Sequence, residues 1–149
     1  MPATAALLAA GLLLPACGGG GGSPTAASAP TPTATPTPGP SAVVVLEVGN
    51  FEDLVLLADG VWLVDFYAPG CSYCTLMEPI VEQLAVDFAD RALVGKVNVQ
   101  TEIPLMTAWN ILGWPTFVVM KNGTEVDRWL GATTYEQLGG MLEAALQAP

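Results

Sequence analysis

Histidine is absent from this chain, and basic residues are scarce. Four lysine and arginine residues stand against fourteen aspartate and glutamate residues in 149 positions. Without histidine, the chain cannot build Ser-His or Cys-His nucleophile pairs or a c-type haem signature. The formal net charge of −10 would repel phosphate backbones, so nucleic acids are not expected as partners. The acidity otherwise favours solubility.

Cysteine is also scarce. Cys17 stands alone, and the other two form Cys71-Ser72-Tyr73-Cys74. Such a spacing can serve a metal site, a structural disulfide or a redox pair. A structural zinc site needs four ligands, and the chain has neither a second C-x-x-C nor histidine to complete it. A disulfide across so short a loop constrains the unfolded chain little. The spacing therefore favours a redox pair, with neither metal nor organic cofactor.

The first residues do not read as part of a fold. Residues 3–14 are an apolar stretch, shorter than the about 20 residues of a membrane-spanning helix but suited to a signal peptide. Leu14-Pro15-Ala16-Cys17 resembles the lipobox of bacterial lipoproteins, in which cleavage leaves a lipidated N-terminal cysteine. The resemblance implies a signal peptide over 1–16 and firm attachment to a membrane through lipid on Cys17. The alternative is an ordinary secretory signal with an incidental cysteine.

Residues 17–42 predict a tether. A run of glycines is followed by proline, threonine, serine and alanine, without one charged side chain. This composition offers almost nothing large to bury, so we expect disorder, with a flexible hinge before a stiffer polyproline-like spacer. At about 3.1 Å per residue when extended, the spacer could hold a domain tens of ångströms from a membrane.

From residue 43 to residue 149 the pattern changes to alternating strands and helices. Strands are predicted over residues 43–47, 61–67, 93–99, 117–121 and 126–130, the second of them buried on both faces. Helices are predicted over residues 51–58, 71–90 and 104–109, with a last one ending near Gln147. Asn50 with Asp53 and Thr133 with Glu136 are the expected N-terminal caps of the first and last helices.

The order of these elements predicts the fold class. Asn122-Gly123 is a strong hairpin signal, so the last two strands should be antiparallel, whereas the earlier strands are separated by helical crossovers and should be parallel. The order β-α-β-α-β-α-β-β-α therefore predicts an α/β fold with a mixed central sheet and helices on both faces.

Five segments, in register over residues 43–149, resemble the thioredoxin family. They are Val64-Asp65-Phe66-Tyr67-Ala68 before the cysteine pair, Pro79 after it, Lys96-Val97-Asn98-Val99, Gly113-Trp114-Pro115-Thr116, and Lys121-Asn122-Gly123 with Gly131-Ala132. The resemblance implies a thioredoxin fold and a thiol–disulfide oxidoreductase that needs no cofactor beyond its own dithiol.

The resemblance implies a role for each cysteine. Cys71 is expected at the start of a helix, where unpaired N–H groups and the helix dipole lower the pKa of the thiol, so that Cys71 is the nucleophile. Cys74, one turn further and deeper, is the resolving thiol that closes the disulfide and expels the product.

Asp65 and Lys96 are expected to support this chemistry. Asp65 is a lone carboxylate in an apolar strand, where burial should raise its pKa. In the family this position is a buried acid that accepts the proton of the resolving cysteine, and Lys96 stands at the position of its partner. The alternatives are that Asp65 faces solvent at a strand end and that Lys96 is an ordinary surface lysine.

Pro115 is similar to the family's cis-proline, beside which the backbone of residue 114 pairs with an extended substrate segment. Substrate contacts are expected from Gly70, Ser72, Tyr73, Trp114, Pro115 and Thr116. Three places depart from the family: Gly70 replaces a common tryptophan, Ser72-Tyr73 replaces Gly-Pro, and Trp114 replaces a small β-branched residue. Trp114 either supplies the aromatic lid missing at position 70 or shapes substrate choice. All three places touch the sulfurs, so the redox potential is not implied by the resemblance.

We therefore predict a monomeric, lipid-anchored protein disulfide reductase outside the cytosol. Reduced Cys71 would attack a protein disulfide, and Cys74 would release the resulting mixed disulfide. The expected partners are protein dithiol or disulfide substrates and a membrane protein that carries electrons to the domain. The alternatives are an oxidase or isomerase of exported proteins, and a non-enzymatic binding lipoprotein on the same scaffold.

Overall fold

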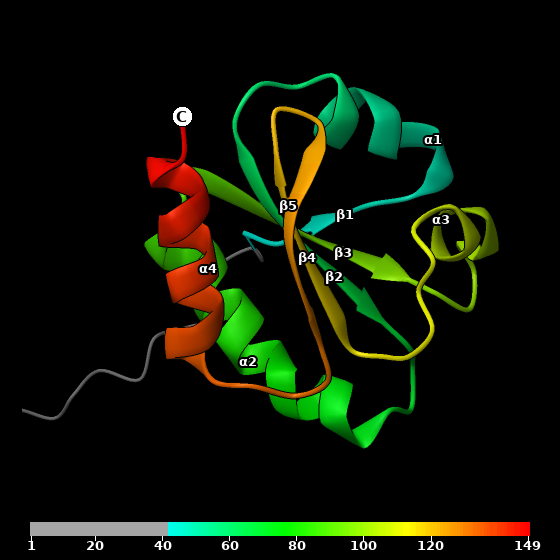
Figure 1. The fold of residues 1–149 in the computed structure, drawn as a ribbon. Helices are drawn as coiled ribbons and strands as arrows, with labels where there is room; N and C mark the ends of the chain where they lie inside the picture. The colour runs from blue at the N-terminus through cyan, green and yellow to red at the C-terminus, as the bar shows by residue number, and fades with distance from the viewer. Residues whose placement is uncertain (1–41) are drawn as a thin grey trace, which may run out of the picture. The chain divides into compact units, whose positions relative to one another are not determined.

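A five-stranded mixed sheet forms the centre of residues 42–149, the part of the chain that the computed structural model describes. The strand order is β1 (Val44–Val45), β3 (Ala92–Asn98), β2 (Val61–Tyr67), β4 (Thr116–Lys121) and β5 (Thr124–Leu130) (Figure 1). The first three strands are parallel, and β4 runs antiparallel to both β2 and β5. This confirms the predicted mixed sheet, although β1 is shorter than the predicted strand. The predicted signal peptide, Cys17 and most of the predicted tether lie outside the described residues.

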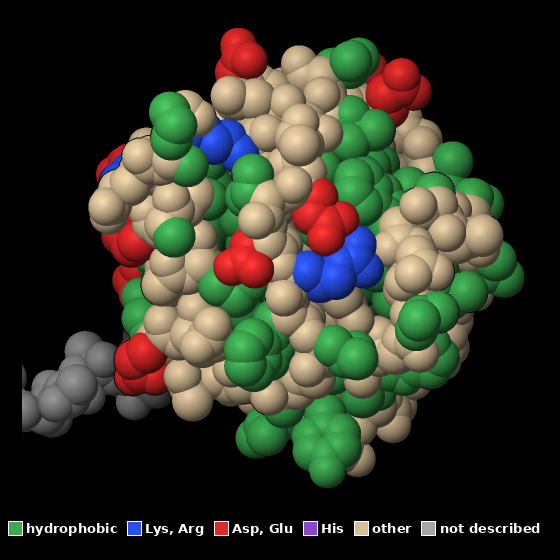
Figure 2. Space-filling view, in the orientation of Figure 1, with side chains coloured by type: hydrophobic (Ala, Val, Ile, Leu, Met, Phe, Trp, Pro, Cys, Tyr) green, Lys and Arg blue, Asp and Glu red, His purple; other side chains and the backbone are tan. Residues whose placement is uncertain are grey.

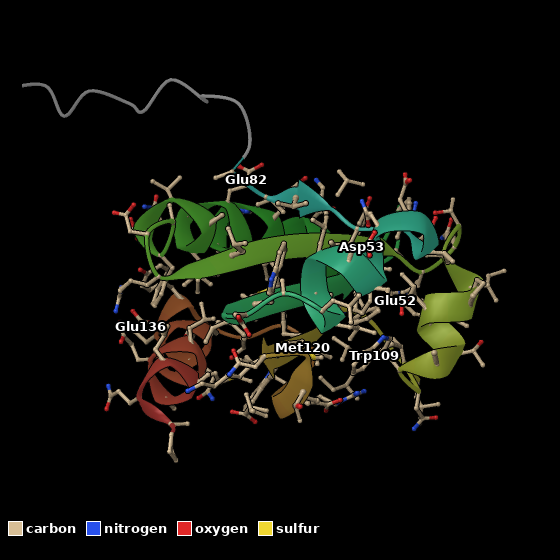
Figure 3. The ribbon with its side chains drawn as sticks, turned by 90° about the horizontal axis from the view of Figure 1, so that it is seen from above. Glu52, Asp53, Glu82, Trp109, Met120 and Glu136 are labelled. Carbon is tan, nitrogen blue, oxygen red and sulfur yellow. The ribbon has the colours of Figure 1, made fainter. Side chains whose placement is uncertain are left out.

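Helices cover both faces of the sheet, as predicted (Figures 1 and 3). Helices α2 (Ser72–Asp87) and α4 (Tyr135–Gln147) pack on one face. The other face is covered by α1 (Val48–Phe51), the π-helix η1 (Glu52–Leu56) that continues it, and α3 (Ile103–Ala108). Figure 3 places Glu82 of α2 and Trp109, which ends α3, on opposite sides of the sheet.

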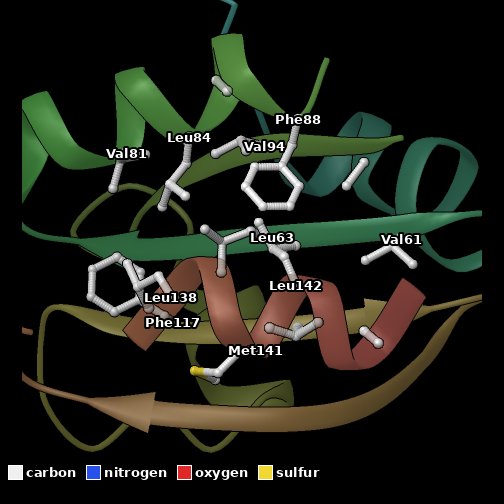
Figure 4. Packing of buried hydrophobic residues seen from close by; sticks show 14 of the residues in the cluster. Val61, Leu63, Val81, Leu84, Phe88, Val94, Phe117, Leu138, Met141 and Leu142 are labelled. Carbon is white, nitrogen blue, oxygen red and sulfur yellow. The ribbon is translucent and has the colours of Figure 1, made fainter. Parts of the chain in front are cut away.

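The central strand β2 feeds both cores because successive side chains of a strand point to opposite faces. Val61 and Leu63 enter the apolar cluster under α2 and α4, which Figure 4 shows in close view. Trp62, Val64 and Phe66 enter the cluster on the other face. Burying one such side chain stabilises the fold by about 1.5–3 kcal/mol. The same alternation places Asp65 on the face of Val61 and Leu63, beneath α2.

The first helix begins earlier than predicted. Glu47, not Asn50, is the N-cap, and Asn50 lies inside the first turn, where its Oδ1 accepts a hydrogen bond of 2.8 Å from the Glu47 N–H. Asp53 falls in η1 and takes no part in the cap. The early start is stabilised from elsewhere in the fold, since the Val48 N–H donates to the Glu102 carboxylate at 2.8 Å. The predicted capping box is therefore present but begins three residues earlier, with Glu47 as the N-cap and Asn50 as its partner.

The N-cap of the last helix lies one residue later than predicted. Thr134, not Thr133, is the N-cap of α4, and its hydroxyl oxygen accepts a hydrogen bond from the Gln137 N–H. The Thr133 N–H instead donates to the sulfur of Met77 in α2 at 3.3 Å. A contact between distant segments therefore decides which of two adjacent threonines caps the helix.

The predicted hairpin is confirmed, and its turn is locked to the rest of the domain. Asn122 and Gly123 both have positive φ, of 48° and 75°. Gly60 and Asn122 exchange two hydrogen bonds of 2.9 Å, because the Asn122 N–H donates to the Gly60 carbonyl and the Gly60 N–H donates to Asn122 Oδ1. A Cβ atom on Gly123 would lie 2.1 Å from the carbonyl oxygen of Leu56.

Gly123→Ala should therefore destabilise the domain by about 2–3 kcal/mol, because alanine is strained at positive φ and meets backbone that cannot rotate away. Gly140→Ala is the matched control, since no atom lies within 4 Å of a Cβ atom at this position in α4. It should stabilise the domain by about 0.5–1 kcal/mol through helix propensity. Urea unfolding of both variants measures the difference, and a similar effect of the two substitutions would contradict the packing described for the turn.

Candidate active site

The cysteine pair lies where β2 ends and α2 begins. Cys71 is the N-cap of α2, with extended backbone, and its N–H donates to the Ala68 carbonyl at 3.2 Å. Gly70, just before it, has a φ of 80°, a conformation that favours glycine. The chain can thus turn sharply out of the sheet and present Cys71 at the helix N-terminus, where the sequence placed it.

The two sulfurs lie in unequal surroundings. Cys71 is half-buried and Cys74 is buried, and both are free thiols. The Cys71 Sγ accepts a hydrogen bond of 3.2 Å from the Cys74 N–H. Hydrogen bonds from the Cys74 thiol and from backbone N–H groups lower the pKa of Cys71. Burial, together with the hydrogen bond to Cys71, raises the pKa of Cys74 to about 12. The exposed sulfur is therefore the better thiolate, and the buried one holds its proton.

Asp65 is a buried carboxylate beneath this helix. Its side chain is 6% exposed, and its Oδ1 has no hydrogen-bond partner among the described residues. Burial raises the pKa of Asp65 to about 7, with Lys96 lowering it and Glu78 raising it. Asp65 therefore does not face solvent, and the predicted rise of its pKa has its predicted cause.

Lys96 is the strand neighbour of Asp65. The two residues are paired in register on the parallel strands β2 and β3. Lys96 is half-buried, and its Nζ lies 5.8 Å from the centre of the Tyr67 ring. Within residues 42–149 no salt bridge joins it to Asp65, so it acts on that carboxyl through space.

A cavity of about 170 Å³ connects these groups. Its lining includes Asp65, Cys74, Glu78, Glu82 and Lys96. A water molecule occupies about 30 Å³ in the liquid, so the cavity has room for water between polar groups. The arrangement can therefore pass a proton from Cys74 to Asp65 through water. Glu78 was not among the sequence-predicted residues, although its four-residue spacing from Cys74 on one helix was visible.

The loop before β4 approaches the exposed sulfur. The Trp114–Pro115 peptide bond is cis, as expected from the resemblance. The Trp114 carbonyl oxygen lies 3.9 Å from Cys71 Sγ, and the Pro115 carbonyl accepts a hydrogen bond of 2.8 Å from the Gly131 N–H. Thr116 is buried, and its hydroxyl donates to the Gly113 carbonyl at 2.7 Å, so its side chain holds the loop together.

Apolar side chains are exposed around the cysteine pair. Gly70, Ser72 and Tyr73 are exposed beside it, and Trp114 is 44% exposed. The sequence analysis missed Leu112 and Leu130, which are 85% and 63% exposed. Leu130, at the end of β5, packs close to Gly113 in the loop before β4. Figure 2 shows hydrophobic side chains gathered at its lower edge, where Figure 1 shows the N-terminal end of α2 and the loop before β4. This surface suits contact with another polypeptide.

Residues 42–149 contain neither a candidate metal-binding cluster nor a membrane-spanning helix. No group of three or more histidine, cysteine, aspartate or glutamate side chains is placed to hold a metal ion there. None of the helices in this part of the chain combines the length and apolarity needed to cross a membrane.

Comparison with known proteins agrees with the fold. A family model described as Thioredoxin matches residues 42–144. A thioredoxin of Chlorobaculum thiosulfatiphilum is 36% identical over 83 residues, which cover 56% of this chain and 77% of that protein. A thioredoxin of Staphylococcus saprophyticus is 32% identical over 105 residues, covering 70% and 99%. Protein disulfide-isomerase 2-3 of Arabidopsis thaliana is 34% identical over 79 residues, covering 53% and 18%. The chain therefore belongs to the thioredoxin family of thiol–disulfide oxidoreductases.

Proposed function

We propose that this chain is a membrane-anchored protein disulfide reductase that acts outside the cytosol, with Cys71 as its nucleophile and Cys74 as its resolving thiol. The observation that carries the proposal is the difference between the two sulfurs. Cys71 is accessible and has a lowered thiol pKa, whereas Cys74 is buried and has a raised one. The thiolate is the attacking species, so the first step belongs to Cys71.

The first step is attack of the Cys71 thiolate on one sulfur of a substrate disulfide. A Cys71–substrate disulfide forms, the substrate disulfide breaks, and the departing sulfur leaves as a thiolate that takes a proton from solvent. The negative charge on Cys71 is consumed in this step. Because that charge and the hydrogen bond to Cys71 both raise the pKa of Cys74, the mixed disulfide makes Cys74 easier to deprotonate.

In the second step, Asp65 accepts the proton of Cys74 through water in the cavity, and Cys74 attacks the sulfur of Cys71. The Cys71–Cys74 disulfide forms, and the second substrate sulfur leaves as a thiolate. Two electrons have passed from the dithiol to the substrate. A base with a pKa of about 7 suits this task, because about half of it is ionised at neutral pH and the carboxylate is still basic.

Substrate docking is proposed beside Trp114 and Pro115. The Trp114 backbone lies next to Cys71, so a substrate segment that pairs with it would bring its disulfide to the exposed sulfur. Leu112, Trp114 and Leu130 offer apolar surface beside this segment. The exposed side chain of Trp114 favours a role in substrate choice over a role as a lid.

The proposed location is supported by the sequence of the first residues. The lipobox-like Leu14-Pro15-Ala16-Cys17 and the proline-rich tether support lipid anchoring at Cys17. A reductase outside the cytosol needs a membrane protein that returns electrons to it. The second candidate is a disulfide oxidase or isomerase, favoured by the similarity to a protein disulfide-isomerase.

The redox state of the pair in cells tests direction. Cells are quenched with acid and treated with a thiol-reactive maleimide polymer, and the protein is separated by mass. A reductase should carry Cys71 and Cys74 mostly as thiols, because its electron donor keeps the pair reduced. A mostly oxidised pair would favour the oxidase instead.

In the same cells, Cys17→Ser should move the protein out of the membrane fraction, and retention there would contradict lipid anchoring.

A further inference from the structure

We propose that Glu78 is a positioning residue for the resolving step. Its negative charge offsets the positive charge of Lys96 at Asp65 and so keeps the buried carboxyl a competent acceptor for the proton of Cys74. The inference rests on the proposed function, because it concerns the second step of that reaction. It assigns a role to a charged side chain that neither touches substrate nor belongs to the cysteine pair.

The helix places Glu78 where such an effect is felt. Cys74, Glu78 and Glu82 follow one another at intervals of four residues on α2, so they lie on one helix face. All three line the cavity that also contains Asp65 and Lys96. Glu78 comes one turn after Cys74, and Glu82 lies a further turn along the helix, where Figure 3 labels it near the beginning of β1.

The charges that face Asp65 come from few elements. Strand β3 contributes Lys96, helix α2 contributes Cys74, Glu78 and Glu82, and β2 itself contributes Tyr67. The strand on the other side, β4, places Phe117 opposite Asp65 and brings no charge. The charge balance at Asp65 therefore depends on one cation, Lys96, and on one carboxylate of α2, Glu78.

Without Glu78, the positive charge of Lys96 would act on Asp65 without an opposing charge. Asp65 is 6% exposed and its Oδ1 lacks a hydrogen-bond partner in the described chain, so solvent screens nearby charges from it only in part. An unopposed lysine would stabilise the carboxylate and weaken it as a base. Glu78 offsets this effect, which agrees with the opposite influences of Lys96 and Glu78 on the pKa of Asp65.

The test compares Glu78→Gln with Glu82→Gln in reduced protein. Both substitutions remove one exposed carboxylate from the same helix face and keep the side-chain size. Carbon-13 NMR of the Asp65 carboxyl gives its titration midpoint directly. Glu78→Gln should lower this midpoint by about half a pH unit, the size expected for a partly screened charge. Glu82→Gln should leave it within the error of the measurement, and Lys96→Gln should move it upward.

Two kinetic readouts separate this role from a merely structural one. The acidic limb of the pH profile for release of the mixed disulfide should shift with the Asp65 midpoint in Glu78→Gln. Alkylation of Cys71 by iodoacetamide should keep the wild-type rate at pH 9, where Asp65 is ionised in both proteins and acts on the Cys71 thiol equally. An unchanged midpoint, an equal shift in Glu82→Gln, or slowed alkylation would each overturn the proposal. The midpoint is measured without substrate, so it can fail or succeed independently of the proposed reductase activity.

Discussion

Cys71→Ser should reduce the rate of insulin disulfide reduction, with dithiothreitol as electron donor, to the rate of dithiothreitol alone. The serine hydroxyl fits the position but is not ionised near neutral pH and cannot form a disulfide. The Cys71 sulfur is the one that is accessible and close to the Trp114 backbone. Cys74 is buried, with its thiol pKa raised to about 12, so it cannot replace Cys71 as the attacking thiolate.

Cys74→Ser is the matched control for this loss. It should also lower the turnover rate, but after the first attack rather than before it, so the reduced variant, mixed with insulin without dithiothreitol, should accumulate in covalent complex with insulin chains. Thermal unfolding of both variants close to the wild type would show that the losses are chemical. Substantial insulin reduction by Cys71→Ser would contradict the assignment of the nucleophile.

Asp65→Asn should stabilise the domain by about 4 kcal/mol at pH 8, the free energy that corresponds to a pKa raised from 3.8 to about 7. Below pH 4 both the folded and the unfolded protein carry a protonated Asp65, and the variant should gain little. Between pH 4 and pH 7 the unfolded chain releases this proton while the folded protein keeps it. Wild-type stability should therefore fall as pH rises through this range, and the loss should be complete above the folded pKa.

Urea unfolding of wild type and variant between pH 3 and pH 9 measures this difference. Other titrating groups, such as Glu136 and Tyr135, have shifted pKa values of their own but are present in both proteins and cancel. The stability difference should grow from pH 4 to pH 7 and then level off. A difference independent of pH would mean that Asp65 titrates in the fold as it does in the unfolded chain.

Asp65 lowers the stability of the domain while it serves the proposed reaction. Within residues 42–149 its Oδ1 has no hydrogen-bond partner, and the buried charge reduces stability at the pH where the domain is proposed to work. The variant that gains stability should therefore resolve mixed disulfides more slowly, because it has lost the proton acceptor. Such an exchange of stability for activity is common at functional sites.

The parts of the fold that follow from local sequence were predictable. The apolar run of β2 and the Asn122-Gly123 turn carry their own signals, and both elements lie where the sequence placed them. The two helix starts were misplaced because contacts between distant segments decide them. The Val48–Glu102 hydrogen bond and the Thr133–Met77 hydrogen bond join residues that no local pattern relates.

In the candidate site, too, some residues were predictable from local sequence and others were not. Cys71 at a helix start and Asp65 in an apolar strand were visible as residue types in a pattern, and the structure brings them to the same end of the sheet. Leu130 was not visible in this way, because it reaches the site only by packing on the loop of Gly113. Glu78 had a spacing signal, but its meaning depends on Lys96, which arrives from another strand.

Trapping of the mixed disulfide shows whether Cys71 attacks disulfides and Cys74 resolves them. Purified, reduced Cys74→Ser is mixed with a disulfide-bonded peptide near neutral pH, and intact mass and peptide mapping identify any adduct. One peptide should be joined to Cys71; dithiothreitol should remove it, and it should be absent from the double variant Cys71→Ser, Cys74→Ser. No adduct, or an adduct that maps to Cys17 with Cys71 unmodified, would contradict this assignment.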